Sequence, residues 1–531
     1  MTAPFRRLVT AVFVFFALTL PGWAQVTAFK QIVAEEAASD PALAKFYQAR
    51  GYTPIWTGWG EMDRARRAAL LNALGTAEAH GLPVALHDPV ALRARMGAAR
   101  TRADLARLEV HLSSAFLAFA QDMQTGLLTP GLVDSEIKRE VPLRDGYETL
   151  MAFTEAQPDA FLRALPPSSA EYTRLLKMKR MLEEGVARGG WGPAVSARAL
   201  EPGESNAAVV QLRNRLIAMG YLSRTMTQTY DASIQAAVTR FQASHGMAED
   251  GVAGPGTLAM INQTMSDRLA QVLVAMERER WINHEGGLGE RHIWVNLTDF
   301  SAQIRDRGVV TFQTRSVIGA HDEDRRSPEF SDVMEHMVIN PSWYVPRSIA
   351  TKEYLPQLKR NAGALGHLEI TDARGRVVNR GAVDFNRYTE RSFPFNMRQP
   401  PSRSNALGLV KFMFPNRYNI YLHDTPAKSL FGREVRTFSH GCIRLNDPFD
   451  FAHALLALQT DDPEAFFRAR LNSGKETKVD LEQKVPVHLV YRTAFTTPTG
   501  ELRFRRDVYG RDARIWQALR REGVVLGDVQ G

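Results

Sequence analysis

The sequence predicts a multidomain α+β protein with an α-helical N-terminal scaffold, a small three-helix unit and a mostly β C-terminal region that carries an inserted lid. Three observations support this fold class. At 531 residues the chain is too long for one hydrophobic core, because single cores stop growing at about 250 to 300 residues. Apolar residues recur every three or four positions up to about residue 262 and every second position after residue 291. The composition, 44% hydrophobic and 23% charged, is that of a folded protein.

Residues 1–24 are typical of a secretory signal peptide. Arg6 and Arg7 precede an apolar run at residues 8–20, and Gly22-Trp23-Ala24 forms a small-x-small cleavage pattern. An uncleaved membrane anchor is the alternative, but the run is shorter than the roughly 20 residues that cross a bilayer. We therefore expect an exported chain that begins near Gln25.

Residues 25–200 are expected to form a helical scaffold domain. Apolar residues spaced by three and four positions share one helix face, which should point into the core. They are Leu105, Leu108, Leu112, Phe116 and Phe119. A second, aromatic group is interrupted by glycine and proline, so we expect a loop packed by its own rings, with carbohydrate stacking as the alternative. This group is Phe46, Tyr47, Tyr52, Trp56 and Trp59.

Residues 203–262 are expected to form a compact three-helix unit. The first helix should end at Gly220, the second should begin near Asp231, and Pro255 suits the first turn of the third. The spacing of the apolar residues gives the buried faces of the first two helices, which carry Val209, Leu212, Leu216, Met219, Ile234, Val238 and Phe241.

Residues 290–515 are expected to form a mostly β domain. Alternation at residues 293–297 and 309–313, with a turn at 306–308 between them, predicts an antiparallel hairpin. Residues 343–405 are rich in proline, arginine and asparagine, contain one helical stretch near 349–358, and are placed like a lid inserted between strands. Further alternation predicts strands around Val410, Phe412, Phe414, Ile420, Leu422, Ile443 and Leu445.

The single cysteine of the chain, Cys442, ends the sequence Ser439-His440-Gly441-Cys442, and 15 residues separate His423 from Ser439. A cysteine nucleophile needs a nearby base, and a reacting carbonyl needs N–H donors where its oxygen becomes anionic. His423 can supply the base, and the glycine lets the backbone approach. On cysteine count alone, a buried structural cysteine is an equal alternative.

The flanking residues place both candidates at strand ends. His423 follows the alternating pair Ile420 and Leu422, and Cys442 precedes a second alternating pair at residues 443–445. Asn446 or Asp447 with Pro448 then opens a helix as its cap and first residue. Adjacent strands lie only about 5 Å apart, so the thiol and the imidazole can meet.

The spacing from His423 to Ser-His-Gly-Cys resembles the active-site signature of the L,D-transpeptidases, whose catalytic domain is of the YkuD type. The order of the GY, YD, FQ, DG and G-x-x-T landmarks in residues 203–262 resembles a peptidoglycan-binding domain. The stretch at residues 327–349 and the order of the domains resemble the large Gram-negative members. The resemblance implies a catalytic domain at residues 290–515 with an inserted cap at about 343–405.

By this resemblance, Cys442 is the nucleophile and His423 its general base. Backbone amides from Ser439 through Gly441 to Cys442 are expected to form the oxyanion site, while His440 shapes the pocket or assists proton transfer. The region of Asp424 is expected to orient the imidazole.

Three further residues are candidates for substrate binding. Arg444 stands where the common motif has asparagine, and it could bind a stem-peptide carboxylate in a bidentate manner or form a surface salt bridge. Trp343 and Tyr344 could line the cleft or belong to the core.

The implied reaction takes place in the periplasm and needs no metal or organic cofactor. The Cys442 thiolate attacks a donor tetrapeptide stem, D-alanine leaves, and a diaminopimelate amine of a second stem resolves the thioester into a 3-3 cross-link. Carbapenems are expected to acylate Cys442. The net charge of +8 suits an acidic partner, and nothing resembles a nucleic-acid-binding module.

Three rival interpretations remain open on the sequence alone. Zinc could be bound by His423, Asp424, His440 and Cys442, which would make a hydrolase. The same nucleophile could transfer the acyl group to water or to a protein lysine. A non-catalytic wall-binding scaffold could be built around residues 203–262. The oligomeric state is not readable from the sequence.

Overall fold

The computed structural model describes residues 27–526, so the predicted signal peptide lies outside the described residues. The chain folds into two compact units, and residues 25–200 are divided between them. Among the described residues, the first unit contains 27–71, 90–117 and 145–158, and the second contains 72–89, 118–144 and 159–526. Within residues 27–526, no helix has the length and apolar character that crossing a bilayer requires.

The first unit is helical, as predicted. Trp56 stacks on Phe153, with ring centroids 5.3 Å apart, and lies 6.0 Å from Phe116. The aromatic group is therefore not a loop packed by its own rings: Phe46 and Tyr47 belong to a helix, and Trp59 is 86% exposed. The helices that contribute to this unit are α1 (Ala28–Ala37), α2 (Pro41–Ala49), α3 (Glu61–Leu74), α4 (Pro89–Ala98), α5 (Arg102–Thr125) and α7 (Gly146–Glu155).

The second unit contains the expected three-helix unit. Asp231 caps the second of these helices through its side chain, and Pro255 occupies the first turn of the third. The predicted helix faces are buried, except that Met219 is only partly buried. The helices outside the β domain are α6 (Pro130–Val133), α8 (Pro158–Arg163), α9 (Ala170–Ala187), α10 (Ala207–Ala218), α11 (Ala232–Ser244), α12 (Pro255–Ile261), α13 (Met265–Arg280) and α18 (Arg511–Arg521).

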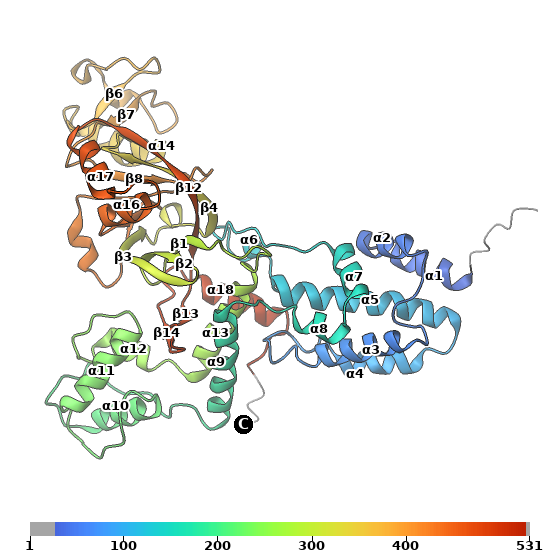
Figure 1. Ribbon diagram of the computed structural model, residues 1–531. Coiled ribbons are helices and arrows are strands. Elements are labelled where there is room, and N and C mark those ends of the chain that lie inside the picture. The colour runs from blue at the N-terminus through green and yellow to red at the C-terminus, as the bar shows by residue number, and fades with distance from the viewer. Residues whose placement is uncertain (1–26, 527–531) are drawn as a thin grey trace, which may run out of the picture. The chain divides into compact units, whose positions relative to one another are not determined.

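A nine-stranded sheet forms the β domain, and it is barrel-like because β2, at one end of the strand order, also pairs with β3, the second strand from the other end (Figure 1). The order is β10-β3-β11-β9-β8-β4-β12-β1-β2. The multidomain α+β fold class is confirmed. The strands are β1 (Arg291–Asn296), β2 (Ser301–Asp306), β3 (Val309–Gly319), β4 (Phe330–Ile339), β8 (Val410–Met413), β9 (Leu422–His423), β10 (Thr437–Ser439), β11 (Ile443–Leu445) and β12 (Thr477–Val490).

The predicted hairpin is correct in its turn but wrong in its first strand. Arg307 and Gly308 adopt positive φ angles of 48° and 81°, as a tight two-residue turn requires, and the strand before them is β2. β1 is a separate strand on the other side of β2. The sequence did not predict β2, because only Ala302 and Ile304 are apolar in this strand and the alternation is too short to recognise.

The inserted segment is a small folded subdomain rather than a simple loop. Its helical stretch is longer than predicted, since α14 (Arg347–Ile349), the π-helix η2 (Ala350–Tyr354) and α15 (Leu355–Arg360) follow one another directly. Its strands pair in the order β5-β7-β6, and it has a hydrophobic cluster of its own. These strands are β5 (Trp343–Tyr344), β6 (Glu369–Thr371) and β7 (Asn396–Gln399).

Two helices, α16 (Pro448–Leu456) and α17 (Pro463–Asn472), pack Phe451 and Phe467 into the core of the barrel. After β12 the chain forms the β13–β14 hairpin (Ala494–Thr496 and Leu502–Phe504) and ends its described part with α18.

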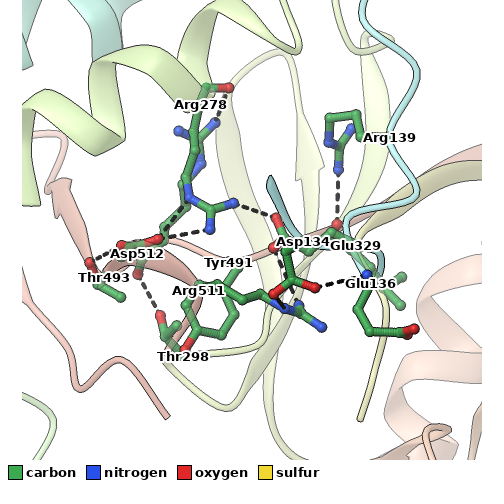
Figure 2. A network of polar contacts seen from close by, with 12 residues as sticks. Asp134, Glu136, Arg139, Arg278, Thr298, Glu329, Tyr491, Thr493, Arg511 and Asp512 are labelled. Carbon is green, nitrogen blue, oxygen red and sulfur yellow. Dashed lines mark hydrogen bonds and ion pairs between the residues drawn. The ribbon is translucent and has the colours of Figure 1, made fainter. Parts of the chain in front are cut away.

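A buried polar network connects α13 and α18 to the barrel (Figure 2). The Arg278 guanidinium lies 2.5 Å from Glu329 and 2.7 Å from Asp512, and Arg511 lies 3.3 Å from Glu329. Burial acts to lower the pKa of Arg278, but the two carboxylates outweigh it and raise that pKa above its usual value. The network therefore fixes these helices by paired charges.

Candidate active site

Three neighbouring strands place Lys411, His423 and Arg444 in one row. β11 runs parallel to β9 with Arg444 opposite His423, and β8 runs antiparallel to β9 with Lys411 opposite His423. The residues at the alternate positions, Phe412, Leu422 and Ile443, are completely buried in the core of the barrel. Because side chains alternate along a strand, the row lies on the outer face of the sheet.

Cys442 lies one position before the start of β11, beside Tyr421. The Ile443 amide donates a hydrogen bond to the Tyr421 carbonyl over 3.0 Å, which fixes this register. The Cys442 thiol is half-buried and donates to the Asn419 carbonyl, with 3.5 Å between sulfur and oxygen. The strand ends predicted to meet are thus hydrogen-bonded neighbours.

The backbone of Asp424 orients the imidazole of His423. Nδ1 of His423 is hydrogen-bonded to the Asp424 carbonyl, and because a carbonyl only accepts, Nδ1 must carry the proton. Nε2 is therefore the basic nitrogen. The Asp424 carboxylate instead accepts from the Leu409 amide at 2.9 Å and from Lys428 at 2.8 Å.

Both candidate catalytic groups are neutral at neutral pH. Burial, with further contributions from the positive charges of Arg444 and Lys411, lowers the pKa of His423 to about 3. Burial also raises the pKa of the Cys442 thiol to about 11, although Tyr421 and the two cations act in the opposite direction. If Cys442 acts as a nucleophile, its thiol would therefore have to give up the proton during attack rather than before it.

The loop before Cys442 has a geometry that requires glycine. Gly441 has a φ of 105°, and a Cβ atom at this position would lie 3.1 Å from Ile420. The Gly441 amide donates to the Ser439 hydroxyl over 3.2 Å, and that hydroxyl donates to the Cys442 carbonyl over 2.5 Å. Within residues 27–526, the Cys442 amide has no hydrogen-bond acceptor, so it is available to a substrate oxyanion.

Of the other predicted site residues, His440, Trp343 and Tyr344 lie apart from this row, whereas Arg444 belongs to it. His440 Nε2 is 2.7 Å from Glu353, on the π-helix of the inserted subdomain. Trp343 is 8% exposed and packs in a hydrophobic cluster, so its side chain belongs to the core, whereas Tyr344 is 68% exposed. Arg444 is half-buried and, in the part of the chain that the structure describes, no acidic side chain pairs with it.

Sequence reasoning missed Lys411, Tyr421 and Asn419. Lys411 and Tyr421 occupy the polar positions between Val410 and Phe412 and between Ile420 and Leu422, so alternation alone would have turned them outward. Their placement beside the thiol depends on the order of the strands in the sheet. No local pattern signals the Asn419 carbonyl, because it is a backbone group in a turn with φ of 55°.

The predicted zinc-binding residues do not gather into a ligand set. The described residues contain no group of three or more histidine, cysteine, aspartate or glutamate side chains placed to hold a metal ion. His440 faces Glu353, and the Asp424 carboxylate faces Lys428.

Three family models match separate parts of the chain. Residues 290–487 match the L,D-transpeptidase catalytic domain, residues 205–261 match a domain described as "Putative peptidoglycan binding domain", and residues 41–178 match a scaffold domain. A Haemophilus influenzae protein named "Putative L,D-transpeptidase" is 31% identical over 225 residues, which cover 42% of this chain and 45% of the relative. The match thus spans about half the length of that relative.

Two crystal structures of L,D-transpeptidases are also similar. The one from Xylanimonas cellulosilytica is 14% identical and covers 56% of this chain and 100% of its own, with a TM-score of 0.17. The one from Stackebrandtia nassauensis is 13% identical and covers 56% of this chain and 97% of its own, with a TM-score of 0.21. These scores are too low to add to what the family models show.

Proposed function

Because the chain carries an L,D-transpeptidase catalytic domain beside a peptidoglycan-binding-type domain, we propose that it cross-links peptidoglycan, with Cys442 as nucleophile and His423 as general base. The observation that supports this most strongly is the orientation of His423. Its Nδ1 is held by the Asp424 carbonyl, which leaves Nε2 basic on the strand next to the thiol. A histidine in this tautomer can accept a proton at Nε2, and its strand is the neighbour of the strand that Cys442 precedes.

In the first half-reaction, the sulfur of Cys442 attacks the carbonyl carbon between the third and fourth residues of a donor tetrapeptide stem. Nε2 of His423 takes the thiol proton as the C–S bond forms, and the Cys442 amide stabilises the oxyanion. The C–N bond then breaks, the proton passes to the leaving nitrogen, and D-alanine departs. The product is a thioester on Cys442.

In the second half-reaction, the side-chain amine of diaminopimelate on another stem attacks the thioester. His423 removes a proton from the attacking nitrogen, and the departing sulfur recovers it when the C–S bond breaks. The new amide is a 3-3 cross-link, and no cofactor takes part in either step.

The two cations of the row supply the recognition of the donor. Arg444 and Lys411 lie on either side of His423, on the same face of the sheet, and among the described residues no carboxylate lies within ion-pair distance of either, although Glu476 acts on Lys411 from farther away. The free carboxylate of a stem peptide would neutralise them, and arginine can hold a carboxylate in a bidentate manner. The burial of both cations makes such an anion more favourable there than in water.

We place this activity in the periplasm, after removal of a signal peptide at residues 1–24. The three-helix unit at 205–261 would hold the enzyme to the cell wall that it modifies. Carbapenems would acylate Cys442, since they present a strained carbonyl to the same nucleophile.

The experiment that tests this function is intact-protein mass spectrometry with a purified disaccharide-tetrapeptide. Wild type should gain the mass of a thioester, release D-alanine and yield a 3-3 dimer, and Cys442→Ala should do none of these. Water or a protein lysine as acceptor would appear as trimmed monomer or as a conjugate in place of the dimer. A folded wild type that forms neither adduct nor D-alanine would overturn the proposal, as would an adduct that persists in Cys442→Ala.

A further inference from the structure

The peptide group that joins Gly441 to Cys442 contains the N–H that the proposed reaction uses for the oxyanion. The bond is trans, so its N–H, from Cys442, and its C=O, from Gly441, point in opposite directions within one plane. The Gly441 carbonyl accepts a hydrogen bond from the Ser327 hydroxyl over 2.6 Å. Whatever holds this carbonyl therefore also sets the direction of the Cys442 amide.

Ser327 is completely buried, and its hydroxyl both accepts and donates. It accepts a hydrogen bond from the Gly319 amide, at the end of β3, over 2.9 Å and donates its single proton to the Gly441 carbonyl. The hydroxyl cannot rotate without losing a hydrogen bond, which is costly in a buried site. Ser327 thus connects the end of β3 to the loop before Cys442.

The balanced network of Figure 2 holds Ser327 in turn. Arg511, which is completely buried and pairs with Glu329 at 3.3 Å, donates to the Ser327 carbonyl over 2.8 Å. The Tyr509 hydroxyl donates to the Gly319 carbonyl over 2.5 Å and accepts from the Ser327 amide over 3.4 Å. The backbone on both sides of the Ser327 hydroxyl is therefore fixed by buried polar groups.

Two glycines allow the segment at residues 325–327 to pass this close. A Cβ atom on Gly319 would lie 2.1 Å from the Arg325 carbonyl oxygen and 2.5 Å from the Ser327 nitrogen. A Cβ atom on Gly441 would lie 3.5 Å from the Arg326 carbonyl oxygen. Any side chain on Gly319 would push the segment away and lengthen the hydrogen bonds of Ser327.

The neighbouring peptide groups are also held, and only one N–H among them stays open. The Ser439 hydroxyl accepts from the Gly441 amide and donates to the Cys442 carbonyl, so it fixes the peptide groups before and after the central one. The Ile443 amide is bonded to a carbonyl of the next chain segment. In the part of the chain that the structure describes, the Cys442 amide alone of these three lacks an acceptor.

We propose that Ser327 is a positioning residue that aims the Cys442 amide at the substrate oxyanion by holding the Gly441 carbonyl. This assignment rests on the proposed function. The hydrogen bond to the carbonyl also polarises the peptide group, which makes its N–H a stronger donor. Because the negative charge on the substrate oxygen develops only in the transition state, Ser327 acts on kcat and not on KM.

The test compares two reactions of the same thiol in Ser327→Ala. With the donor tetrapeptide, kcat for D-alanine release should fall about tenfold to a hundredfold, less than the loss of a complete oxyanion donor, while KM changes less than about twofold. Alkylation of Cys442 by iodoacetamide forms no oxyanion, so its rate should stay within about twofold of wild type. Mass spectrometry follows both reactions, since the chain has one cysteine.

Ser316→Ala is the matched control. Ser316 is also completely buried, and its hydroxyl has no hydrogen-bond partner within residues 27–526, so the variant removes a buried hydroxyl without releasing a carbonyl. Its kcat should equal that of wild type. Ser327→Thr keeps the hydroxyl and should retain kcat within about fivefold of wild type. Thermal unfolding checks that each variant is folded.

The assignment of Ser327 is overturned if Ser327→Ala keeps the kcat of wild type, if alkylation falls as much as D-alanine release, or if Ser316→Ala or Ser327→Thr loses as much. A wild type that is alkylated but forms no thioester overturns the proposed function instead. Hydrogen exchange of residues 439–445 then tests the contact without substrate: it should accelerate in Ser327→Ala and not in Ser316→Ala, and equal exchange in the two variants overturns the assignment.

Discussion

Two clusters of charged side chains in the second unit differ in how their charges are balanced. In the network of Figure 2, Arg278 lies between Glu329 and Asp512, and each of these side chains is at most 6% exposed. In the row beside Cys442, Lys411 and Arg444 flank a neutral imidazole, and the described residues place no acidic side chain within ion-pair distance of either cation. The positive charge of Arg278 is therefore balanced by paired carboxylates, whereas Lys411 and Arg444 have no carboxylate paired with them among the described residues.

The difference separates a structural cluster from a functional one. Burying charge is costly unless an opposite charge and hydrogen bonds compensate it. The network meets that condition with its own residues, so it can hold α13 and α18 to the barrel without a ligand. In the row, burial lowers the pKa of Lys411 and of Arg444. An anionic substrate would offset this unfavourable burial of positive charge.

The largest expected effect comes from breaking the balanced network. Arg278→Met should lower the free energy of unfolding by about 3 to 5 kcal/mol, because Glu329 and Asp512 would remain buried with less compensation. Thermal unfolding measures this change. Arg180→Met is the control, since Arg180 forms an exposed helical pair with Glu184 and its loss should cost under about 1 kcal/mol. Equal losses in the two variants would show that the network is not structural.

The catalytic row should respond to substitution in rate rather than in stability, and His423 should show the largest change. In wild type the rate of thioester formation should be constant from about pH 5 to 9, because His423 becomes protonated only near its pKa of about 3 and the thiol ionises only near about 11. His423→Gln should lower the rate about a hundredfold to a thousandfold at pH 7.

The pH dependence of the His423→Gln variant gives a second, independent test. Without the base, the rate should follow the thiolate fraction, which rises tenfold for each pH unit below the thiol pKa of about 11. Stopped assays of D-alanine release at a series of pH values below 11 measure the dependence of the rate on pH for wild type and for the variant. A variant whose rate stays constant with pH would remove His423 from its role.

The sequence predicted the parts of this comparison that depend on local spacing. The helix faces, the strand ends at His423 and Cys442 and the α+β architecture follow from periods of 3.6 and 2. Lys411 and the pairing of Arg278 with Asp512, 234 residues apart, depend on which strands and helices become neighbours. The order of strands in a sheet cannot be read from the sequence of a single strand, so the sequence predicted only part of the row beside Cys442.

A smaller effect is expected from Arg444. Arg444→Gln should raise the KM for a donor with a free carboxylate about tenfold to a hundredfold, or roughly 1.4 to 2.7 kcal/mol, and change kcat much less. Steady-state kinetics with free and amidated donors measures this split. The amidated donor should be affected less than twofold, and an equal loss for both donors would mean that Arg444 does not bind the carboxylate.

The smallest effect, on the rate of thioester formation, should come from the contact between Glu353 of the inserted subdomain and His440 in the loop before Cys442. Glu353 lies 2.7 Å from His440 and 3.0 Å from Arg325, but all three side chains are about one-third exposed, and exposed pairs of this kind contribute only about 0 to 1 kcal/mol. Glu353→Gln should therefore change thioester formation by no more than about fivefold. Lys352→Gln is the matched control, because it removes the neighbouring pair with Asp324, also 3.0 Å long, without touching His440. If Glu353→Gln lowered the rate more than a hundredfold while Lys352→Gln did not, His440 would have to act in proton transfer, and the unpaired row alone would no longer account for catalysis.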